Sequence, residues 1–409
     1  MNEPHAKEES PVDHRRWLRD LDLAHFEPTS PGMPYWLPRG LIVMSALQEH
    51  WRGAHDQWGY QEVSTPLLAR DPLYASSGHL EHYAENMFFC EVDGKDRFGL
   101  KPVNCPGTMV IFRCRPRSHR ELPLRLACYD LLHRNELSGA LTGLLRVQAL
   151  RQDDAHIFIR PEQARDEILG LLNLAARLYA GFGLRIKLRL GGPPAGHLGD
   201  DATWARAEAV LADALNAAVG GDGYVRAEGE GAFYGPKVDL LVADSLGREW
   251  QMGTFQLDFE MPRRLGCRYT GADGLEHVPA VIHRALIGSF ERFLGILLEH
   301  MDGHLPAFMA PVQLRLVPVG DRHRGAAMAL RDAVRREGFR VELGGSNERV
   351  AAQVRDAVLH RVPFIGVIGD RETADGMVSV REAGGADLGA ISQAALVELL
   401  RRRCRPPEV

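Results

Sequence analysis

The sequence has no long apolar run, no closely spaced cysteine pair and few lysines. No stretch approaches the roughly 18 apolar residues of a transmembrane helix, which excludes a membrane span. The polar start, MNEPHAKEESPVDHRR, lacks the apolar core of a secretory signal. The six cysteines show neither C-x-x-C nor disulfide-framework spacing, so a reducing, cytoplasmic compartment is expected.

Length and charge limit the classes of protein to which the chain can belong. A chain of 409 residues predicts two to three domains. The net charge of −5, from 49 basic and 54 acidic residues, excludes a protein that coats nucleic acid, although one basic groove stays possible. The 45% hydrophobic and 25% charged residues are typical of a soluble globular chain, so no class of unusual composition applies.

Hydrophobic periodicity divides the chain into three parts. Residues 1–11, rich in Glu and Pro, are expected to be a disordered lead-in. Residues 12–308 read as one α+β domain, and 309–409 as a small α/β domain of alternating strands and helices. The boundary between the two domains is placed between Pro306 and Pro311.

The larger part combines helices with short strands. Asp13 predicts an N-cap for a helix in DHRRWLRDLDLAHF, and helices are also expected over 41–59, 164–183, 201–220 and 283–300. A strand is expected over 60–68. Short strands with Gly and Pro punctuation over 96–102, 124–134, 144–160 and 237–259 predict an antiparallel sheet.

Two arginine segments carry candidate phosphate-binding chemistry. Arg134 and Glu136 lie two apart on an expected strand, so they share one face, and Arg146 follows on a returning strand. Arg134 could hold a phosphate with its guanidinium fork. An ordinary hairpin with a surface ion pair is the alternative. Ser289 and Arg292, near an expected helix start, either admit a ligand or belong to a core helix.

A thiol and two imidazoles form a possible metal set, although they are far apart in the chain. Cys105, His156 and His283 suit Zn²⁺ chemically and leave a fourth position open. Their spacing alone makes no zinc site, and a buried cysteine with two core histidines is the alternative. Two more segments are candidates for binding a polar substrate: Tyr234 and Lys237 in AFYGPKVDL, and the pair Asp153–Asp154. The alternative is that both segments are solvated loops.

Seven segments in one order resemble the class II threonyl-tRNA synthetases. They are LKPVNCPG, HRNELSGALTGLLRV, RQDDAHIF, AFYGPKVDL, QMGTFQLDF, VIHRALIGSFERFLGILLEH and APVQ. The resemblance runs from about Asp13 to near the C-terminus. It implies a class II catalytic domain, an antiparallel sheet flanked by helices, followed by an α/β anticodon-binding domain. It also implies a homodimer, because GLIVMSALQEHW…STP resembles the motif at the family's subunit interface.

The resemblance implies roles for individual residues. Arg134 would grip the α-phosphate of ATP and Arg292 the γ-phosphate, while Glu136 and Arg146 would place the adenine and the outer phosphates. One Zn²⁺ on Cys105, His156 and His283 would hold the amino group and hydroxyl of threonine. His79 would assist transfer to tRNA. The matching pocket residues are Gln152, Asp154, Tyr234, Gln256 and Ser289 for the substrate, Gln251 for ATP, and Lys237 among the catalytic residues.

Several positions depart from the family pattern. Leu150 stands where an aromatic residue stacks on adenine, Gln148 replaces an arginine, and Thr108 replaces a histidine. The loss of one base–aromatic stack costs roughly 1–3 kcal/mol. A usually basic strand end reads SVREAGGADLG, and no lysine follows Pro311. Weaker anticodon contact is therefore expected, because phosphate neutralisation sets much of nucleic-acid affinity.

Three functions follow as hypotheses. The first is ATP-dependent activation of threonine, with Mg²⁺, and its transfer to tRNA, without editing in the same chain because the family's N-terminal editing region is not seen. The second is activation of threonine or another β-substituted amino acid for a different acceptor, such as a carrier protein. The third is a non-catalytic, tRNA-sensing paralogue, against which the intact candidate residues argue.

Overall fold

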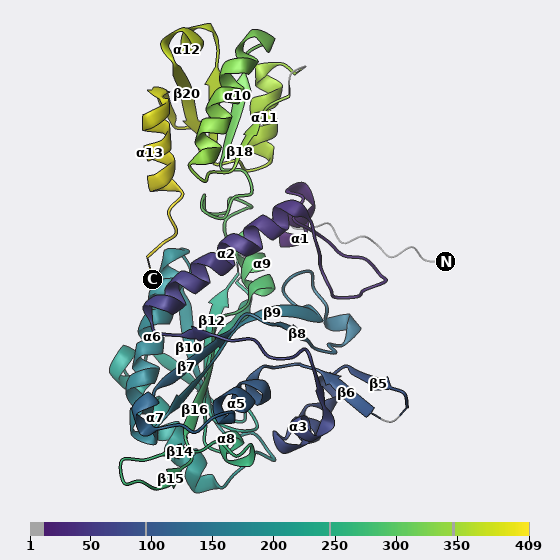
Figure 1. Cartoon of the computed structure of the whole chain (residues 1–409), viewed down its shortest axis with the longest axis vertical. Coiled ribbons are helices and arrows are strands. Elements are labelled where there is room, and N and C mark those ends of the chain that lie inside the picture. The colour runs from purple at the N-terminus through teal and green to yellow at the C-terminus, as the bar shows by residue number, and fades with distance from the viewer. Residues whose placement is uncertain (1–11, 95, 245–246, 346–347, 409) are drawn as a thin grey trace. The chain divides into compact units, whose positions relative to one another are not determined.

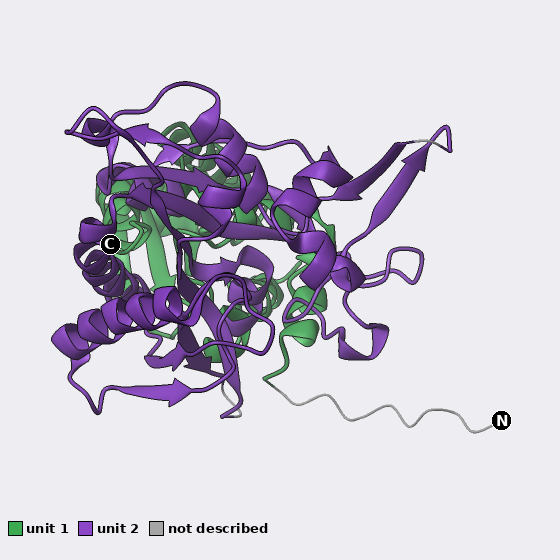
Figure 2. Cartoon of the chain, turned by 90° about the horizontal axis from the view of Figure 1, so that it is seen from below, with its two compact units in different colours: residues 1–25, 35–50, 297–407 green, residues 26–34, 51–296, 408–409 purple. Residues whose placement is uncertain are grey.

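The computed structural model describes residues 12–94, 96–244, 247–345 and 348–408. The expected lead-in over 1–11 lies outside the described residues. The chain forms two compact units, coloured separately in Figure 2: residues 1–25, 35–50 and 297–407 form one, and residues 26–34, 51–296 and 408–409 the other. The helices among the described residues include none with both the length and the apolar character that crossing a bilayer requires.

The second unit is built on a nine-stranded sheet (Figure 1), in the order β11-β10-β12-β13-β16-β9-β7-β3, with β8 beside β9. Its pairs are antiparallel except β10–β11 and β3–β7, so the antiparallel α+β prediction is confirmed. The strands are β3 (Gln61–Glu62), β7 (Leu124–Cys128), β8 (Leu131–His133), β9 (Ala149–Ile159), β10 (Ile186–Gly191), β11 (Tyr224–Ala227), β12 (Lys237–Ala243), β13 (Glu249–Asp258) and β16 (Ala280–Ser289).

Helices cover this sheet, and two small sheets accompany it. The strands β4 (Leu68–Arg70), β5 (Phe89–Val92) and β6 (Asp96–Leu100) form a three-stranded sheet, and β14 (Tyr269–Thr270) pairs with β15 (Glu276–His277). The helices are α3 (Asp71–Ser76), α4 (His79–His82), α5 (Cys105–Arg113), α6 (Ala164–Gly181), α7 (Asp201–Val219) and α8 (Met261–Arg264). Met109 and Phe112 of α5 pack on Leu126 and Phe158 of the sheet, which fixes the helix over this face.

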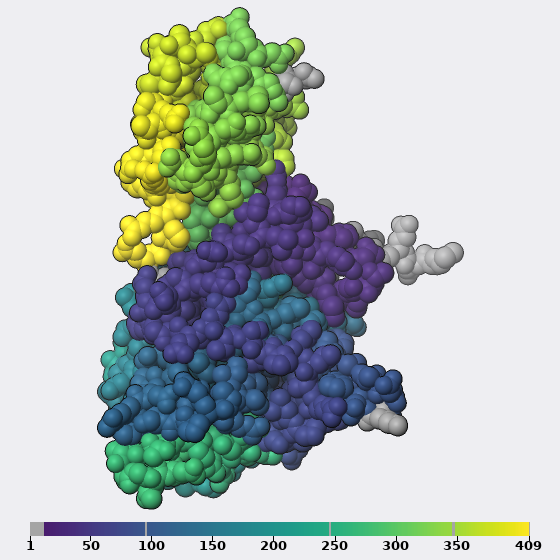
Figure 3. Space-filling model, in the orientation of Figure 1, coloured from purple at the N-terminus to yellow at the C-terminus, as the bar shows by residue number. Residues whose placement is uncertain are grey.

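The first unit contains a five-stranded sheet in the order β18-β17-β19-β20-β21. Its strands are β17 (Leu314–Pro318), β18 (Val341–Leu343), β19 (Phe364–Ile368), β20 (Met377–Glu382) and β21 (Asp387–Ser392), with helices α10 (Asp321–Arg336), α11 (Val350–Leu359), α12 (Asp370–Asp375) and α13 (Gln393–Arg403). The predicted alternation of strands and helices is confirmed. In Figure 3 the atoms of this sheet and its four helices are green to yellow, and those of α13 lie along one side.

The N-terminal residues of the first unit begin with a capped helix. The carboxylate of Asp13 accepts from the Arg15 backbone N–H and caps α1 (His14–Asp20), as predicted. The strands β1 (Ala24–His25) and β2 (Tyr35–Trp36) form a hairpin. Two helices, α2 (Pro38–Gln57) and α9 (Phe290–His300), contain residues of both units.

Three sequence predictions of secondary structure are wrong. Residues 280–289 form β16 between β13 and β9, so the predicted helix over 283–300 begins only at Phe290. The predicted strand over 60–68 is reduced to Gln61–Glu62, and Leu68 begins the separate strand β4. Arg134 and Glu136 follow β8 in a loop and do not share a strand, and Arg146, predicted on the returning strand, precedes β9. In the first case a largely apolar segment fits a buried strand as well as a helix.

Candidate functional site

Neighbouring strands carry the candidate metal and substrate residues in one row across the sheet. His156 of β9 lies opposite His283 of β16, which lies opposite Gln256 of β13, which lies opposite Lys237 of β12. Two residues further along, Asp154 and Thr254 flank Ala285. Because side chains of a strand alternate between faces, positions two apart lie on one face. The register therefore gathers residues that the sequence separates by more than 120 positions.

The three candidate metal ligands converge on one point of this face. Cys105, the first residue of α5, and His156 and His283 are buried, with their ligand atoms all within 4.8 Å of one another. The two imidazole rings are 4.9 Å apart. The predicted set is thus brought together by the fold.

The surroundings of these side chains fit a metal. Nε2 of His283 lies 2.8 Å from a carboxylate oxygen of Asp258, so its Nδ1 is left for a ligand role. Among the described residues, Nδ1 of buried His156 has no hydrogen-bond partner. Burial raises the pKa of the Cys105 thiol and lowers that of His156 well beyond their usual ranges. A neutral imidazole is the ligand form, and a cation would stabilise the thiolate.

A cavity of about 330 Å³ opens on the same sheet. Its lining includes the predicted residues Arg134, Glu136, Arg146, Gln152, Gln251, Gln256, Ser289 and Arg292. Apolar side chains also line it: Leu145, Val147, Leu150 and Met252. A polar, arginine-rich lining beside an apolar one suits a ligand that has both a flat apolar part and a charged part.

Backbone carbonyls orient the arginines. Nε of Arg134 donates to the Pro102 carbonyl and Nη2 to Oε1 of Gln152, each over 3.1 Å. Arg292 donates to the carbonyls of Leu145 and Gln251 over 2.8 Å. Burial, together with the nearby Arg134 and Arg146, lowers the pKa of Arg292 to about 10. Glu136 lies 4.0 Å from Arg146, so one carboxylate faces three arginines, and the remaining positive charge favours an anion such as a phosphate.

The remaining predicted substrate residues lie beside the cavity. Tyr234 donates its hydroxyl proton to Oε1 of Gln256, and its ring is 4.8 Å from that of His283. Oδ2 of Asp154 accepts from Nδ2 of Asn104 over 3.0 Å, and burial raises the pKa of Asp154. A carboxylate on the strand of His156 and a phenol beside His283 therefore lie near the metal-ligand set.

Lys237 and His79 are each held by neighbours. The Lys237 ammonium lies 3.1 Å from the carboxylate of Asp239, which also accepts from Gln251 over 2.8 Å. His79, at the start of α4, is buried, with Nε2 3.9 Å from the Cys105 sulfur. Burial lowers the pKa of His79 to about 3, so its imidazole is neutral.

Sequence reasoning missed three supporting residues. Asp239, Asp258 and Asn104 are fully buried and hold Gln251, His283 and Asp154. Asp239 and Asp258 each lie inside an apolar strand, in KVDLL and QLDF. A charged residue on the inward side of such a strand needs a buried partner, and this is the signal that could have found them.

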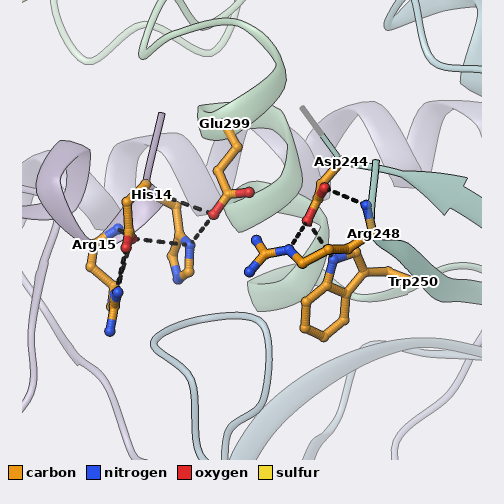
Figure 4. A network of polar contacts seen from close by, with 7 residues as sticks. His14, Arg15, Asp244, Arg248, Trp250 and Glu299 are labelled. Carbon is orange, nitrogen blue, oxygen red and sulfur yellow. Dashed lines mark hydrogen bonds and ion pairs between the residues drawn. The ribbon is translucent and has the colours of Figure 1, made fainter. Parts of the chain in front are cut away.

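A second group with potential metal-ligand atoms lies in the first unit. Nδ1 of His14 is 2.7 Å from Oε1 of Glu299 and 3.7 Å from Asp13 (Figure 4). Asp13 already caps α1 and pairs with the Arg15 guanidinium, which neutralises its charge. The other network in Figure 4 holds the β12–β13 turn, where Asp244 accepts from Trp250 over 2.9 Å.

Two family descriptions match the chain. Residues 88–301 match "tRNA synthetase class II core domain (G, H, P, S and T)". Residues 313–403 match "Anticodon binding domain". The first range covers the nine-stranded sheet except β3, and the second covers the five-stranded sheet.

Similar proteins include two threonine–tRNA ligases of bacteria. The ligase of Caldanaerobacter subterraneus is 44% identical over 94% of this chain and 60% of its own length. That of Thermotoga neapolitana is 44% identical over 96% of this chain and 61% of its own length. The chain therefore spans about three fifths of the length of these curated relatives.

Two solved structures are similar over nearly their whole length. The RNA binding domain of threonyl-tRNA synthetase from Cryptosporidium parvum has a TM-score of 0.92 and 36% identity, covering 96% of this chain and 98% of that one. The putative threonyl-tRNA synthetase ThrRS-1 from Aeropyrum pernix has a TM-score of 0.81 and 30% identity, covering 96% of both chains.

Proposed function

Because this chain belongs to the class II aminoacyl-tRNA synthetase family, with its core and anticodon-binding domains, we propose that it activates threonine with ATP and transfers it to tRNA. One observation carries the proposal. The buried Cys105, His156 and His283 lie on the same sheet face as an arginine-lined cavity. An amino acid and a nucleotide could therefore be held side by side.

We assign ATP, as its magnesium complex, to the cavity. Arg134 would hold the α-phosphate and Arg292 the γ-phosphate, with Arg146 and Glu136 on the rest of the nucleotide. Leu150 and Met252 would contact the base. Attack of the threonine carboxylate on the α-phosphate needs positioning and charge neutralisation above all, and the arginines fixed to backbone carbonyls supply both.

We assign threonine to the space beside the metal-ligand set. Cys105, His156 and His283 would hold one Zn²⁺ per chain, which supplies a Lewis acid for the amino group and hydroxyl. Asp154, Tyr234, Gln152, Gln256 and Ser289 would orient the amino acid, with Lys237 nearby. A site that requires a hydroxyl rejects valine far better than an apolar pocket does.

We assign the transfer step to His79 and the tRNA to the C-terminal domain. His79 is buried beside Cys105, where its imidazole would orient the attacking hydroxyl. A homodimer is proposed as well. The segment after α2 exposes Leu67 and Leu68 to 42% and 43%, and light scattering of the purified chain would measure its mass. A cytoplasmic location agrees with the free thiols of the described cysteines.

One observation favours the alternative acceptor. The basic C-terminal helix is partly neutralised, since Arg401 pairs with Glu337 over 2.6 Å and Arg403 with Glu382 over 2.7 Å. Glu382 lies just after Arg381 of β20, where positive charge would face an anticodon. A carrier protein or another acceptor would not need that charge.

The test is amino-acid-dependent pyrophosphate exchange over a panel with threonine, serine and valine, followed by charging of tRNA. We expect exchange with threonine, little with valine, and charged tRNA. Exchange without charging would favour the alternative acceptor, and no adenylate with any amino acid would favour a tRNA-sensing role. Zinc content, measured by atomic absorption, should be about one per chain. It should fall in Cys105→Ser and stay unchanged in Cys114→Ser, because Cys114 is exposed and outside the site.

A further inference from the structure

The strand β16 is interrupted where it borders the cavity. Ala285 pairs with Asp154 of β9, but the next pair is Ser289 with Gln152. Three residues, Leu286 to Gly288, therefore lie opposite Asp153 alone. At Gly288 the backbone has φ +71°, and a Cβ there would lie 2.0 Å from the Met252 carbonyl oxygen. This bulge turns the chain from β16 into α9.

Side chains, in place of a neighbouring strand, satisfy the polar groups of the bulge. One carboxylate oxygen of Asp153 accepts from the backbone N–H groups of Leu286 and Ile287, over 2.8 and 2.9 Å. The hydroxyl of Tyr179, in α6, donates to the Leu286 carbonyl over 2.7 Å. An unpaired buried backbone group costs about as much as a lost hydrogen bond, so these contacts hold the bulge in its shape.

The other oxygen of Asp153 is held by a buried cationic network. It accepts from the Trp51 indole N–H over 2.6 Å and from the Arg284 guanidinium. Arg284, only 1% exposed, also donates to Nε2 of His55, whose pKa burial lowers to about 3. A buried ion pair offsets its desolvation only when such additional hydrogen bonds are made. The carboxylate is therefore fixed from both sides.

The bulge determines where Arg292, a candidate ATP residue, and Ser289, a candidate amino-acid residue, lie. Ser289 directly follows it, and the Ser289 hydroxyl oxygen accepts from the Arg292 backbone N–H over 3.1 Å. Both side chains line the cavity. We propose that the Asp153–Arg284 pair is a positioning element, which acts through the bulge and the Ser289 hydroxyl to set Arg292 for the nucleotide. The proposal rests on the proposed function only in that the cavity binds ATP.

The test compares carboxylate-to-amide substitutions in the full chain. In Asp153→Asn only one side-chain oxygen can accept, and the amide N–H₂ faces N–H donors in either orientation, those of the bulge or those of Trp51 and Arg284. We expect the KM for ATP in pyrophosphate exchange to rise roughly tenfold or more, and the KM for threonine, which Ser289 would orient, to rise by less. The matched control is Glu167→Gln, which loses the close Arg125–Glu167 pair between β7 and α6. It should lower the melting temperature without changing the KM for ATP.

A milder variant tests the proposal even if Asp153→Asn does not fold. Tyr179→Phe removes only the donor to the Leu286 carbonyl, and we expect a roughly threefold weaker affinity for ATP. If Tyr179→Phe and a folded Asp153→Asn both bind ATP like the unmodified chain, the proposal is overturned. The same holds if only the KM for threonine rises and the KM for ATP stays unchanged.

Two further measurements do not depend on the amino acid or on turnover. Calorimetric titration with ATP measures nucleotide binding directly. Hydrogen exchange of peptides covering 284–292 should be faster in Asp153→Asn than in Glu167→Gln, and equal exchange would contradict the role of Asp153. An unmodified chain that binds ATP but activates no amino acid would refute the proposed function and leave these measurements valid.

Discussion

Leu150 lies at the cavity, where the family resemblance places an aromatic residue. It is buried and packs with Leu132, Val147 and Phe26, so the position is supported from behind by apolar side chains. A leucine offers a base dispersion contact but no π-stacking. The departure from the family pattern at this position therefore changes which contact the cavity wall offers to a base, while an apolar wall is still present.

Leu150→Phe should strengthen ATP binding. We expect the KM for ATP to fall by about threefold to tenfold, since a base–aromatic stack contributes roughly 1–3 kcal/mol and part of it is spent on fitting the larger ring. The KM for threonine, measured in the same exchange assay, is the internal control. An unchanged or higher KM for ATP in a stable variant would show that the base lies elsewhere.

Glu291 is a buried carboxylate with one oxygen occupied by the Arg151 backbone N–H, over 2.9 Å. Its other oxygen lies 4.0 Å from the Arg151 guanidinium, and the ring of Tyr129 is nearby. Burial raises the pKa of Glu291 to about 7. Its side chain therefore ionises in the folded chain at a higher pH than in the unfolded chain.

The stability penalty of Glu291 should grow between its unfolded pKa of 4.5 and its folded pKa of about 7. Below the unfolded pKa both states are protonated, and above the folded pKa the ionised side chain costs up to about 3 kcal/mol. Glu291→Gln removes this ionisation, so its free energy of unfolding should rise relative to the unmodified chain as pH increases. Urea unfolding of both at several pH values measures the difference, and parallel curves would contradict the prediction.

Among the elements, β16 shows best how local pattern and long-range pairing differ. Residues 280–300 are apolar at most positions, and a helix over 283–300 fits the spacing of the apolar residues. The structure makes the first ten a strand, because β13 and β9 provide partners on both sides. Elements with a clear amphipathic pattern or cap, such as α1, α6 and α7, were predicted correctly from sequence.

The bulge in β16 gives a prediction about glycine. Gly288→Ala would force a Cβ against the Met252 carbonyl and retain a positive φ, which together should cost more than about 2 kcal/mol and weaken ATP binding. Gly53→Ala, inside α2 with open space around its Cβ, should be stabilising by about 0.5–1 kcal/mol. Thermal melting of the two variants measures both effects, and equal melting temperatures would refute the argument.

For the chain as a whole, the distribution of charge would decide how strongly tRNA binds under the proposed function. From the last residue of β20 to the first of β21 the chain reads EAGGAD, and Glu382 pairs with Arg403. The arginines of α13 are thus partly neutralised, and the whole C-terminal domain offers fewer free cations for a phosphate backbone than its arginine content indicates.

Gly384→Arg should restore part of this affinity. A Cβ at Gly384 meets no atom within 4 Å, so the substitution fits. We expect tRNA to bind about threefold more tightly, with a steeper dependence on salt. Gly325→Arg adds the same charge on α10, also in open space, and is the matched control. Equal effects of both variants, in filter binding over a range of salt concentrations, would mean that the turn is not near the tRNA.

Hydrophobic periodicity was enough to predict the α+β architecture and the alternating C-terminal domain, because periodicity is local. The three metal-ligand candidates came from the resemblance of the ordered motifs to a known family, since their spacing alone makes no metal site. Folding in three dimensions settled the rest. The meeting of Cys105 with His156 and His283, the strand at 280–289 and the bulge behind Ser289 depend on register between strands that are distant in the chain. Register follows from which partners are available for backbone hydrogen bonds, and no local stretch of sequence encodes that.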